Sequence, residues 1–212
     1  MEDAKMRHEE VNIIVSQPRK IAAITIARRV AKELHCQLGG LVGYQVGLDK
    51  KVNKMDIENE TKTSLLFCTT GVVLQKLIKE KTVSSYTHII LDEIHERDID
   101  TDLVMAILRE FLSVDNGTRL ILMSATLNAA KFAKYFTMNS EILPPIVAMT
   151  VERPYQIEVM YLDDLQPLEI SEDAINYALP SITTEMYQIA AKLITLLLQE
   201  SDKSILVFLR GY

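Results

Sequence analysis

Short apolar runs that end in polar residues recur along the first 125 residues of the chain. They occupy 12–15, 65–68, 88–91 and 119–123, and hydroxyl, acidic or basic side chains follow each of them. Apolar runs of this length are typical of strands that are buried on both faces of a parallel sheet. Because ligands bind outside the carboxyl ends of such strands, we expect the chemistry of this protein at these polar tips.

Helical periodicity fills the segments between the runs. Apolar residues at spacings of three and four predict helices over 21–35, about 70–81, 100–113, 184–200 and, with Asn128 as its cap, up to 136. The apolar faces are expected to include Ile78 in the second helix and Leu103 and Leu108 in the third. Repeated strand, loop and helix units of this length predict an α/β fold with a right-handed parallel sheet.

The pattern changes near Pro154, where we place a boundary between a unit over 1–150 and another over 151–212. Three further stretches are predicted as strands, namely 146–149 at the end of the first unit and 155–161 and 204–209 in the second. The stretch 49–62 is polar, lacks aromatic residues and is predicted as a surface loop.

The run 88–91 is followed directly by Asp92 and Glu93, with His95 two residues further on. An Asp at a strand tip can hold Mg²⁺, mostly through water, and a neighbouring Glu can activate the water that attacks a γ-phosphate. The alternative is structural, because acidic residues after a strand also cap helices and stabilise their first turn. The other polar tips favour the hydrolase interpretation. Arg97 is expected in a salt bridge with Glu93 or Glu96.

These tips resemble the motifs of the DEAH-box branch of superfamily 2 RNA helicases, with DEIH as the acidic motif. Residues 16–20 resemble motif Ia, 69–71 motif Ib, 92–95 motif II and 124–126 motif III, in the order and spacing of the family. Residues 43–48 are similar to the Tudor-domain-containing helicases of the spindle-E type, which belong to the piRNA pathway. The resemblance covers nearly the whole chain.

The resemblance implies a RecA-like parallel sheet flanked by helices. The first lobe, over 1–150, is expected to be nearly complete and to carry motifs Ia, Ib, II and III. Residues 151–212 are expected to be a linker and the start of a second RecA-like lobe, truncated at motif IV. ATP and Mg²⁺ are the implied cofactors.

The resemblance also implies catalytic roles. Asp92 would bind the Mg²⁺ shell, Glu93 would activate water, and His95 would sense the nucleotide at the interface between lobes. Ser124 and Thr126 would relay that state as coupling residues. For Ser124 a second interpretation stays open, since its hydroxyl is also suited to capping the helix that follows.

On the RNA side, Arg19 and Thr69 match family positions that touch the nucleic-acid backbone, to which guanidinium and hydroxyl groups are suited. Single-stranded RNA is therefore the expected partner, together with proteins of the piRNA pathway. Lys20 has two interpretations, an RNA contact or a solvated surface residue. Tyr44 is weighed as a stacking platform or, with more support, as a packed residue beside its strand.

The phosphate loop of the family, G-x-x-x-x-G-K-S/T, does not occur in this sequence, which contains only seven glycines. Its backbone amides and lysine would hold the β and γ phosphates. We therefore expect the chain to be a helicase fragment that lacks the first strand and phosphate loop of its lobe and is inactive alone, whereas its full-length parent hydrolyses ATP.

Charge and composition bear on RNA binding and on the cellular compartment of the protein. The net charge of −6 arises in 151–212, with 4 basic and 10 acidic residues, while 1–150 carries 19 of each. A neutral lobe can still carry a basic RNA track. Two cysteines without metal-ligand spacing favour a reducing compartment, and no apolar run is long enough for a membrane span. We expect a cytoplasmic protein, in perinuclear granules as the spindle-E resemblance implies.

The function expected from these observations is ATP-dependent RNA remodelling in piRNA-mediated transposon silencing. The alternative is a non-catalytic RNA-binding or scaffold module of a larger protein. A DEAH-like DNA helicase stays open too, because backbone contacts distinguish RNA from DNA only through the 2′-hydroxyl.

Overall fold

The computed structural model of this chain describes residues 10–53, 63–114, 117–125, 129–137, 143–149, 155–161, 164, 182–200 and 204–209. The chain divides into two compact units, Met1–Ala148 and Met149–Tyr212. The assignment of these units to two RecA-like lobes stays a prediction.

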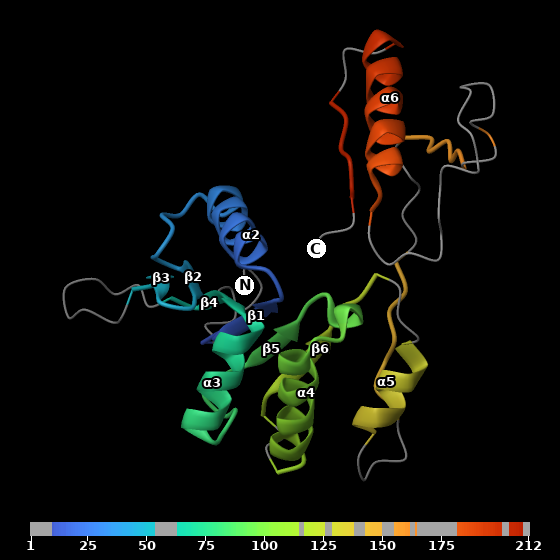
Figure 1. Cartoon of the computed structure of the whole chain (residues 1–212). Helices are drawn as coiled ribbons and strands as arrows, with labels where there is room; N and C mark the ends of the chain where they lie inside the picture. Colours follow the sequence, from blue (N-terminus) through green and yellow to red (C-terminus); the bar gives the residue numbers. More distant parts are fainter. Residues whose placement is uncertain are drawn as a thin grey trace. The chain divides into compact units, whose positions relative to one another are not determined.

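One mixed sheet organises the first unit (Figure 1). Its strands are β1 (Ile13–Gln17), β2 (Val42–Val46), β3 (Asp49–Lys51), β4 (Leu65–Thr69), β5 (His88–Leu91) and β6 (Arg119–Leu122). They lie in the order β3-β2-β4-β1-β5-β6, and all neighbours are parallel except β2 and β3. Ser16 of β1 pairs with Cys68 on one side and Leu91 on the other, so the carboxyl ends of these three strands meet at one edge.

Helices cover both faces of the sheet, as Figure 1 shows. Helix α2 (Lys20–Glu33) lies on one face, where Ala23, Ala27 and Ala31 are buried at a spacing of four residues. Their small side chains let the helix pack closely against β2 and β4. Helices α3 (Thr70–Glu80) and α4 (Ile99–Leu112) lie side by side on the opposite face. The expected α/β architecture with flanking helices is therefore confirmed.

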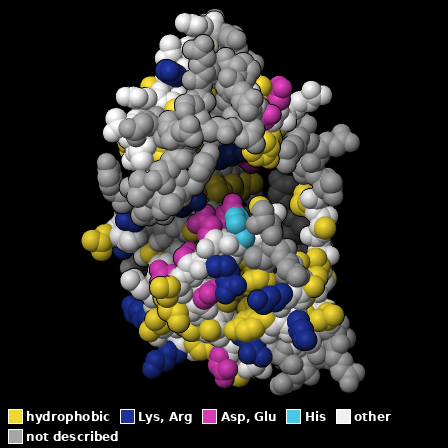
Figure 2. All heavy atoms as spheres, turned by 45° about the vertical axis from the view of Figure 1, so that its right-hand side comes forward, with side chains coloured by type: hydrophobic (Ala, Val, Ile, Leu, Met, Phe, Trp, Pro, Cys, Tyr) yellow, Lys and Arg dark blue, Asp and Glu magenta, His cyan; other side chains and the backbone are white. Residues whose placement is uncertain are grey.

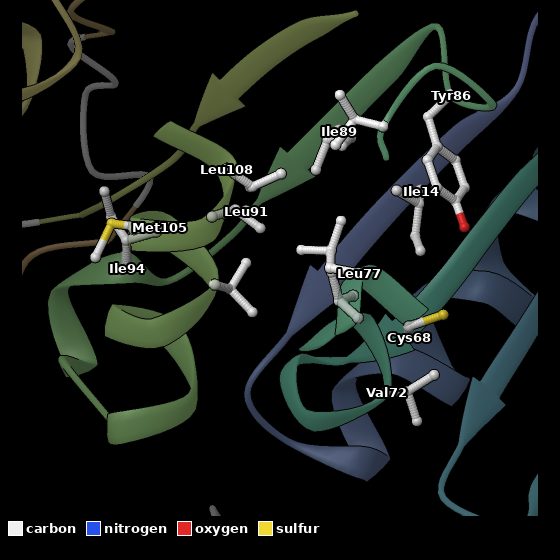
Figure 3. Close-up of a cluster of buried hydrophobic side chains, with 13 residues drawn as sticks. Ile14, Cys68, Val72, Leu77, Tyr86, Ile89, Leu91, Ile94, Met105 and Leu108 are labelled. Atoms are coloured by element: carbon white, nitrogen blue, oxygen red, sulfur yellow. The ribbon is translucent and has the colours of Figure 1, made fainter. Parts of the chain in front are cut away.

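The larger hydrophobic core lies under α3 and α4 (Figure 3). Ile14, Ile89 and Leu91 contribute the sheet side of this core, while Leu77 and Leu108 contribute the helix side. Burying side chains of this size stabilises a fold by about 1.5–3 kcal/mol each. The core thus fixes β1 and β5, whose tips carry the polar residues of interest.

The helices begin and end close to the predicted positions. The described residues also include the helices α5 (Ala129–Phe136) in the first unit and α6 (Thr184–Glu200) in the second. Two predicted inward residues are wrong: Ile78 is 58% exposed and Leu103 is 48% exposed. The buried stripe instead includes Val72 in α3 and Met105 in α4, so the buried face of each helix is shifted around the helix axis from the predicted face. The predicted cap Asn128 lies outside the described residues.

The loop predicted over 49–62 begins as a strand. Residues 49–51 form β3, which pairs antiparallel with β2 through a tight turn at Gly47 and Leu48. Gly47 has φ +61°, a left-handed conformation that glycine adopts without strain and that suits such two-residue turns. The strand lies at the edge of the sheet with all three residues exposed, so it carries no apolar pattern. Residues 54–62 lie outside the described part.

Three other predicted strands are not present. Residues 146–149, 155–161 and 204–209, all of which the structure describes, form no strand. Val147, Ile157 and Phe208 are 85%, 64% and 86% exposed, so these stretches lack the packing that a buried strand requires. Apolar pattern alone does not make a strand, since the backbone must also find a partner ladder. None of the helices in the described part is long and apolar enough to pass through a bilayer.

Candidate active site

The candidate residues of the first unit gather at the carboxyl edge of the sheet. Asp92 and Glu93 directly follow β5, Thr69 ends β4, and Ser124 lies two residues beyond β6. Between them, β1 ends at Gln17, which is paired in register with Thr69. Thr126 lies outside the described residues. Figure 2 shows acidic side chains gathered beside a histidine on this part of the surface.

Asp92 is held by both carboxylate oxygens. The side-chain amide of Gln17 donates to its Oδ2 at 2.6 Å, and the backbone N–H of Glu93 donates to its Oδ1 at 2.8 Å. Its own N–H donates to the carbonyl of Ser16 at 3.2 Å. Each carboxylate oxygen can accept more than one hydrogen bond, so Asp92 can still receive a further ligand.

Gln17 is a site residue that sequence reasoning missed. It is only 3% exposed although its side chain is polar, and its amide reaches across from β1 to Asp92. A buried amide without a partner would be costly, so the hydrogen bond to Asp92 stabilises the position of the Gln17 side chain. The available signal was a polar residue at the end of the apolar run 12–15.

The segment after Asp92 has an unusual backbone. Glu93 has φ +55° and Arg97 has φ +51°, so left-handed residues bracket the short 3₁₀ turn η1 (Ile94–Glu96). Such a conformation costs a non-glycine residue about 1–3 kcal/mol, and it persists only where the surroundings impose it. Ile94 supplies one constraint, being 2% exposed with its N–H donating to the carbonyl of Met123 at 3.2 Å.

That backbone contact also joins two of the predicted motifs. Met123 receives the Ile94 N–H and donates its own N–H to the carbonyl of Leu91 at 2.8 Å. Met123, which precedes Ser124, is therefore hydrogen-bonded to the residue before Asp92 and to the residue after Glu93. Ser124 itself is exposed, and whether its hydroxyl relays the nucleotide state stays a prediction.

His95 lies close to Glu93. Its Nδ1 is 3.3 Å from Glu93 Oε2, near enough for an ion pair when the imidazole is protonated. The same nitrogen is buried and has no hydrogen bond of acceptable geometry in the described part of the chain. The two side chains therefore lie close together without a formed hydrogen bond between them.

Arg97 forms its salt bridge with Asp102, so the expectation of Glu93 or Glu96 was wrong. Its Nε and a terminal nitrogen donate to the two Asp102 oxygens at 2.8 and 2.9 Å. These hydrogen bonds are the largest cause of two pKa shifts: they lower the pKa of Asp102 and raise the pKa of Arg97. The left-handed backbone at Arg97 turns its side chain toward α4, which sequence spacing cannot reveal.

Arg19, the predicted RNA contact, donates from a terminal nitrogen to Glu96 Oε1 at 2.8 Å. Its side chain is 75% exposed, whereas that of Glu96 is 32% exposed. Thr69 precedes α3 and does not cap it with its side chain. Tyr44 is 6% exposed and its hydroxyl donates to Asp49 at 3.3 Å, which confirms packing beside the strand.

A cavity of about 260 Å³ adjoins Arg97, the residue that follows η1. Met105 and Phe132 give it an apolar surface, and Arg97, Asp102, Lys131 and Tyr135 complete the lining. Neither Asp92, Glu93 nor His95 lines it, so it is separate from the candidate catalytic groups.

The side chains at the sheet edge fit a magnesium ion that arrives with a nucleotide. In the described residues no group of three or more His, Cys, Asp and Glu could hold a metal by itself. Mg²⁺ commonly binds through one or two carboxylates together with waters and substrate phosphates. The oriented carboxylate of Asp92 meets that requirement, and it is the group that would hold the ion.

A mostly parallel sheet with helices on both faces, and an Asp-Glu pair after the interior strand β5, have the architecture of a RecA-like α/β domain. Residues 2–134 match the DEAD/DEAH box helicase family. The chain belongs to that family.

Within this family, the chain is similar to helicases of two named kinds. The chain is 46% identical over 198 residues to the probable ATP-dependent RNA helicase spindle-E of Aedes aegypti, a match covering 92% of this chain and 14% of the relative. It is 42% identical over 194 residues to the ATP-dependent RNA helicase TDRD9 of Danio rerio, covering 89% and 14%. The chain thus spans about one seventh of the length of these relatives.

Proposed function

We propose that this chain is the part of a DEAH-type, ATP-dependent RNA helicase that presents the metal- and water-positioning carboxylates to ATP and one side of the RNA track. The observation that carries the proposal is the hydrogen-bonded orientation of Asp92 at the carboxyl edge of the sheet. The names of the spindle-E and TDRD9 relatives support ATP and RNA as ligands.

In this mechanism Asp92 would hold Mg²⁺, and the Gln17 amide keeps its carboxylate in place. The chemistry that Mg²⁺ would supply at Asp92 is neutralisation of charge on the ATP phosphates. Glu93, whose side chain is 43% exposed, accepts a proton from the attacking water. His95 lies 3.3 Å from Glu93 and senses the change of charge there.

RNA lies on the other part of the same edge. Arg19 lies just after β1, and Thr69 is the last residue of β4. Because β1 and β4 are neighbouring parallel strands, both side chains can reach one stretch of phosphate backbone. The position of Asp92 after β5, on the other side of β1, brings the proposed hydrolytic and RNA-binding groups within one sheet edge.

We further propose that the full-length protein acts in piRNA-mediated transposon silencing, in the cytoplasm and in perinuclear granules. The similarity to spindle-E and TDRD9 supports this role. The competing hypothesis is a non-catalytic RNA-binding scaffold, and ATP turnover separates the two.

The test is RNA-stimulated phosphate release by the full-length protein and by its Glu93→Gln variant. Loss of a general base lowers turnover by about a hundredfold or more. We expect that loss in Glu93→Gln with ATP affinity retained, and no change in Glu33→Gln, which removes an exposed acid of α2. The 212-residue chain alone should not hydrolyse ATP, because its sequence contains no phosphate loop.

Two results would contradict the proposal. A full-length wild type that binds RNA and never hydrolyses ATP would favour the scaffold. Robust hydrolysis by the 212-residue chain would show that the β and γ phosphates are held by residues other than a phosphate loop.

A further inference from the structure

Arg19 and Glu96 connect two segments to which the proposed function gives different tasks. Arg19 follows β1 in the proposed RNA track, and Glu96 ends the turn η1 that follows Glu93. Their side chains meet at 2.8 Å although they are 77 residues apart in sequence. The same guanidinium is therefore already engaged by a carboxylate where an RNA phosphate is expected.

The Arg19–Glu96 contact is weak enough for another anion to displace the Glu96 carboxylate. It is a single hydrogen bond, whereas Arg97 and Asp102 are joined by two. With Arg19 75% exposed, solvent screens the attraction, and exposed pairs of this kind contribute little to stability. A phosphate can accept two parallel hydrogen bonds from a guanidinium, so it competes well with a carboxylate held by one.

The residues around Glu96 in the sequence are held by their own contacts. The Glu96 side chain is therefore the part of this turn that can move when Arg19 binds another group. Ile94 is buried and bonded to Met123, and Arg97 is bonded to Asp102. The Glu96 N–H donates to the carbonyl of Glu93 at 3.0 Å. A Glu96 carboxylate that loses Arg19 therefore stays in the turn that begins after Glu93 and contains His95.

We propose that Glu96 is a positioning residue that holds Arg19 in the RNA-free protein, and that a phosphate of single-stranded RNA displaces it. This inference rests on the proposed function. Glu96 thereby lowers the affinity for RNA, and RNA binding returns a free carboxylate to the turn beside Glu93 and His95. Because Glu96 and the RNA phosphate compete for the same guanidinium, a change in Glu96 that weakens this pair should strengthen RNA binding.

The test is a double-mutant cycle on the full-length protein with a labelled single-stranded oligouridine. Glu96→Gln should tighten binding by about two- to fivefold, the range that an exposed ion pair provides. In the Arg19→Ala background, Glu96→Gln should change nothing, because the residue it restrains is gone. The RNA concentration for half-maximal stimulation of ATPase activity should fall by the same factor as the dissociation constant.

The matched control is Glu33→Gln. Glu33 accepts a hydrogen bond from Arg29 at 2.8 Å, so this change also removes one carboxylate from an exposed arginine pair. It should leave RNA affinity unchanged. A deoxyuridine oligonucleotide of equal length should show the same relative tightening in Glu96→Gln, because the phosphate is common to both polymers.

The possible outcomes separate cleanly. Unchanged RNA affinity in Glu96→Gln would overturn the competition and leave the proposed function intact. Equal tightening in the Arg19→Ala background, or in Glu33→Gln, would show general charge repulsion and overturn it too. A tightening confined to the ribose polymer would point to the 2′-hydroxyl and contradict displacement by phosphate. Absence of RNA binding by the wild type would overturn both proposals.

Discussion

The side-chain amide nitrogen of Gln17 lies 2.6 Å from Oδ2 of Asp92 and joins the tips of β1 and β5 across the sheet edge. Gln17 is buried, so its position is set by the core and not by solvent. The Asp92 carboxylate thus takes its orientation from a neighbouring strand. A metal site of this kind depends on the partner that orients its ligand as well as on the ligand.

Replacing Gln17 by Met should weaken magnesium use and leave the fold largely intact, because Met fills a similar volume without a donor. Removal of such an orienting partner commonly costs about tenfold or more in metal affinity or activity. We expect the Mg²⁺ concentration for half-maximal ATPase activity of the full-length protein to rise accordingly. Gln37→Met, at an exposed loop position, should behave as wild type. An unchanged Mg²⁺ dependence in Gln17→Met would argue against the orienting role.

The Arg97–Asp102 pair predicts a specific dependence of stability on pH. The hydrogen bonds from Arg97 lower the pKa of Asp102 in the folded chain. A lowered pKa contributes stability above the unfolded value of about 4, and the contribution disappears as pH falls through the folded pKa. Asp102→Asn should therefore be less stable than wild type at neutral pH, and the difference should vanish in strong acid.

Urea unfolding of the chain at neutral pH and at about pH 2 measures this difference. Glu110→Gln, an exposed position on the same helix, should show no such pH-dependent loss. A constant difference between Asp102→Asn and wild type at all pH values would mean that packing, and not the charge, is what the substitution removes.

Sequence reasoning located the strands that carry the site because β1 and β4 are largely buried on both faces, while β5 is buried on one face and partly buried on the other. Their apolar runs record that burial directly. It missed β3, whose exposed residues are held by backbone pairing with β2. It overpredicted strands such as 204–209, since hydrophobicity does not supply a pairing partner.

The site shows the same division. Asp92 and Glu93 follow from chain order, because the residue after a buried strand must emerge at the sheet edge. Gln17 against Asp92, and Arg19 against Glu96, each join residues more than 70 positions apart. Arg97 reaches Asp102 because of a left-handed backbone that no spacing rule anticipates. Only the folded chain reveals these three contacts.

The two cysteines should differ sharply in reactivity. Cys68 is fully buried in the core, and burial raises the pKa of its thiol to about 12, whereas Cys36 is half-buried. The thiolate is the reactive form, so Cys68 should resist alkylation in the folded chain. At about pH 8, iodoacetamide should label Cys36 alone, and both residues should be labelled in denaturant, as peptide mass spectrometry can measure. Rapid native labelling of Cys68 would contradict its burial.

The core under α4 predicts a contrast between two leucines of the same helix. Leu108 is fully buried against the sheet, whereas Leu103 is 48% exposed. Leu108→Ala should lower the free energy of unfolding by about 2–5 kcal/mol, because it removes buried surface and leaves a cavity. Leu103→Ala should cost less than about 1 kcal/mol, since alanine favours the helix and little burial is lost. Chemical denaturation of both variants compares them directly, and equal losses would mean that α4 packs on the sheet through a different face.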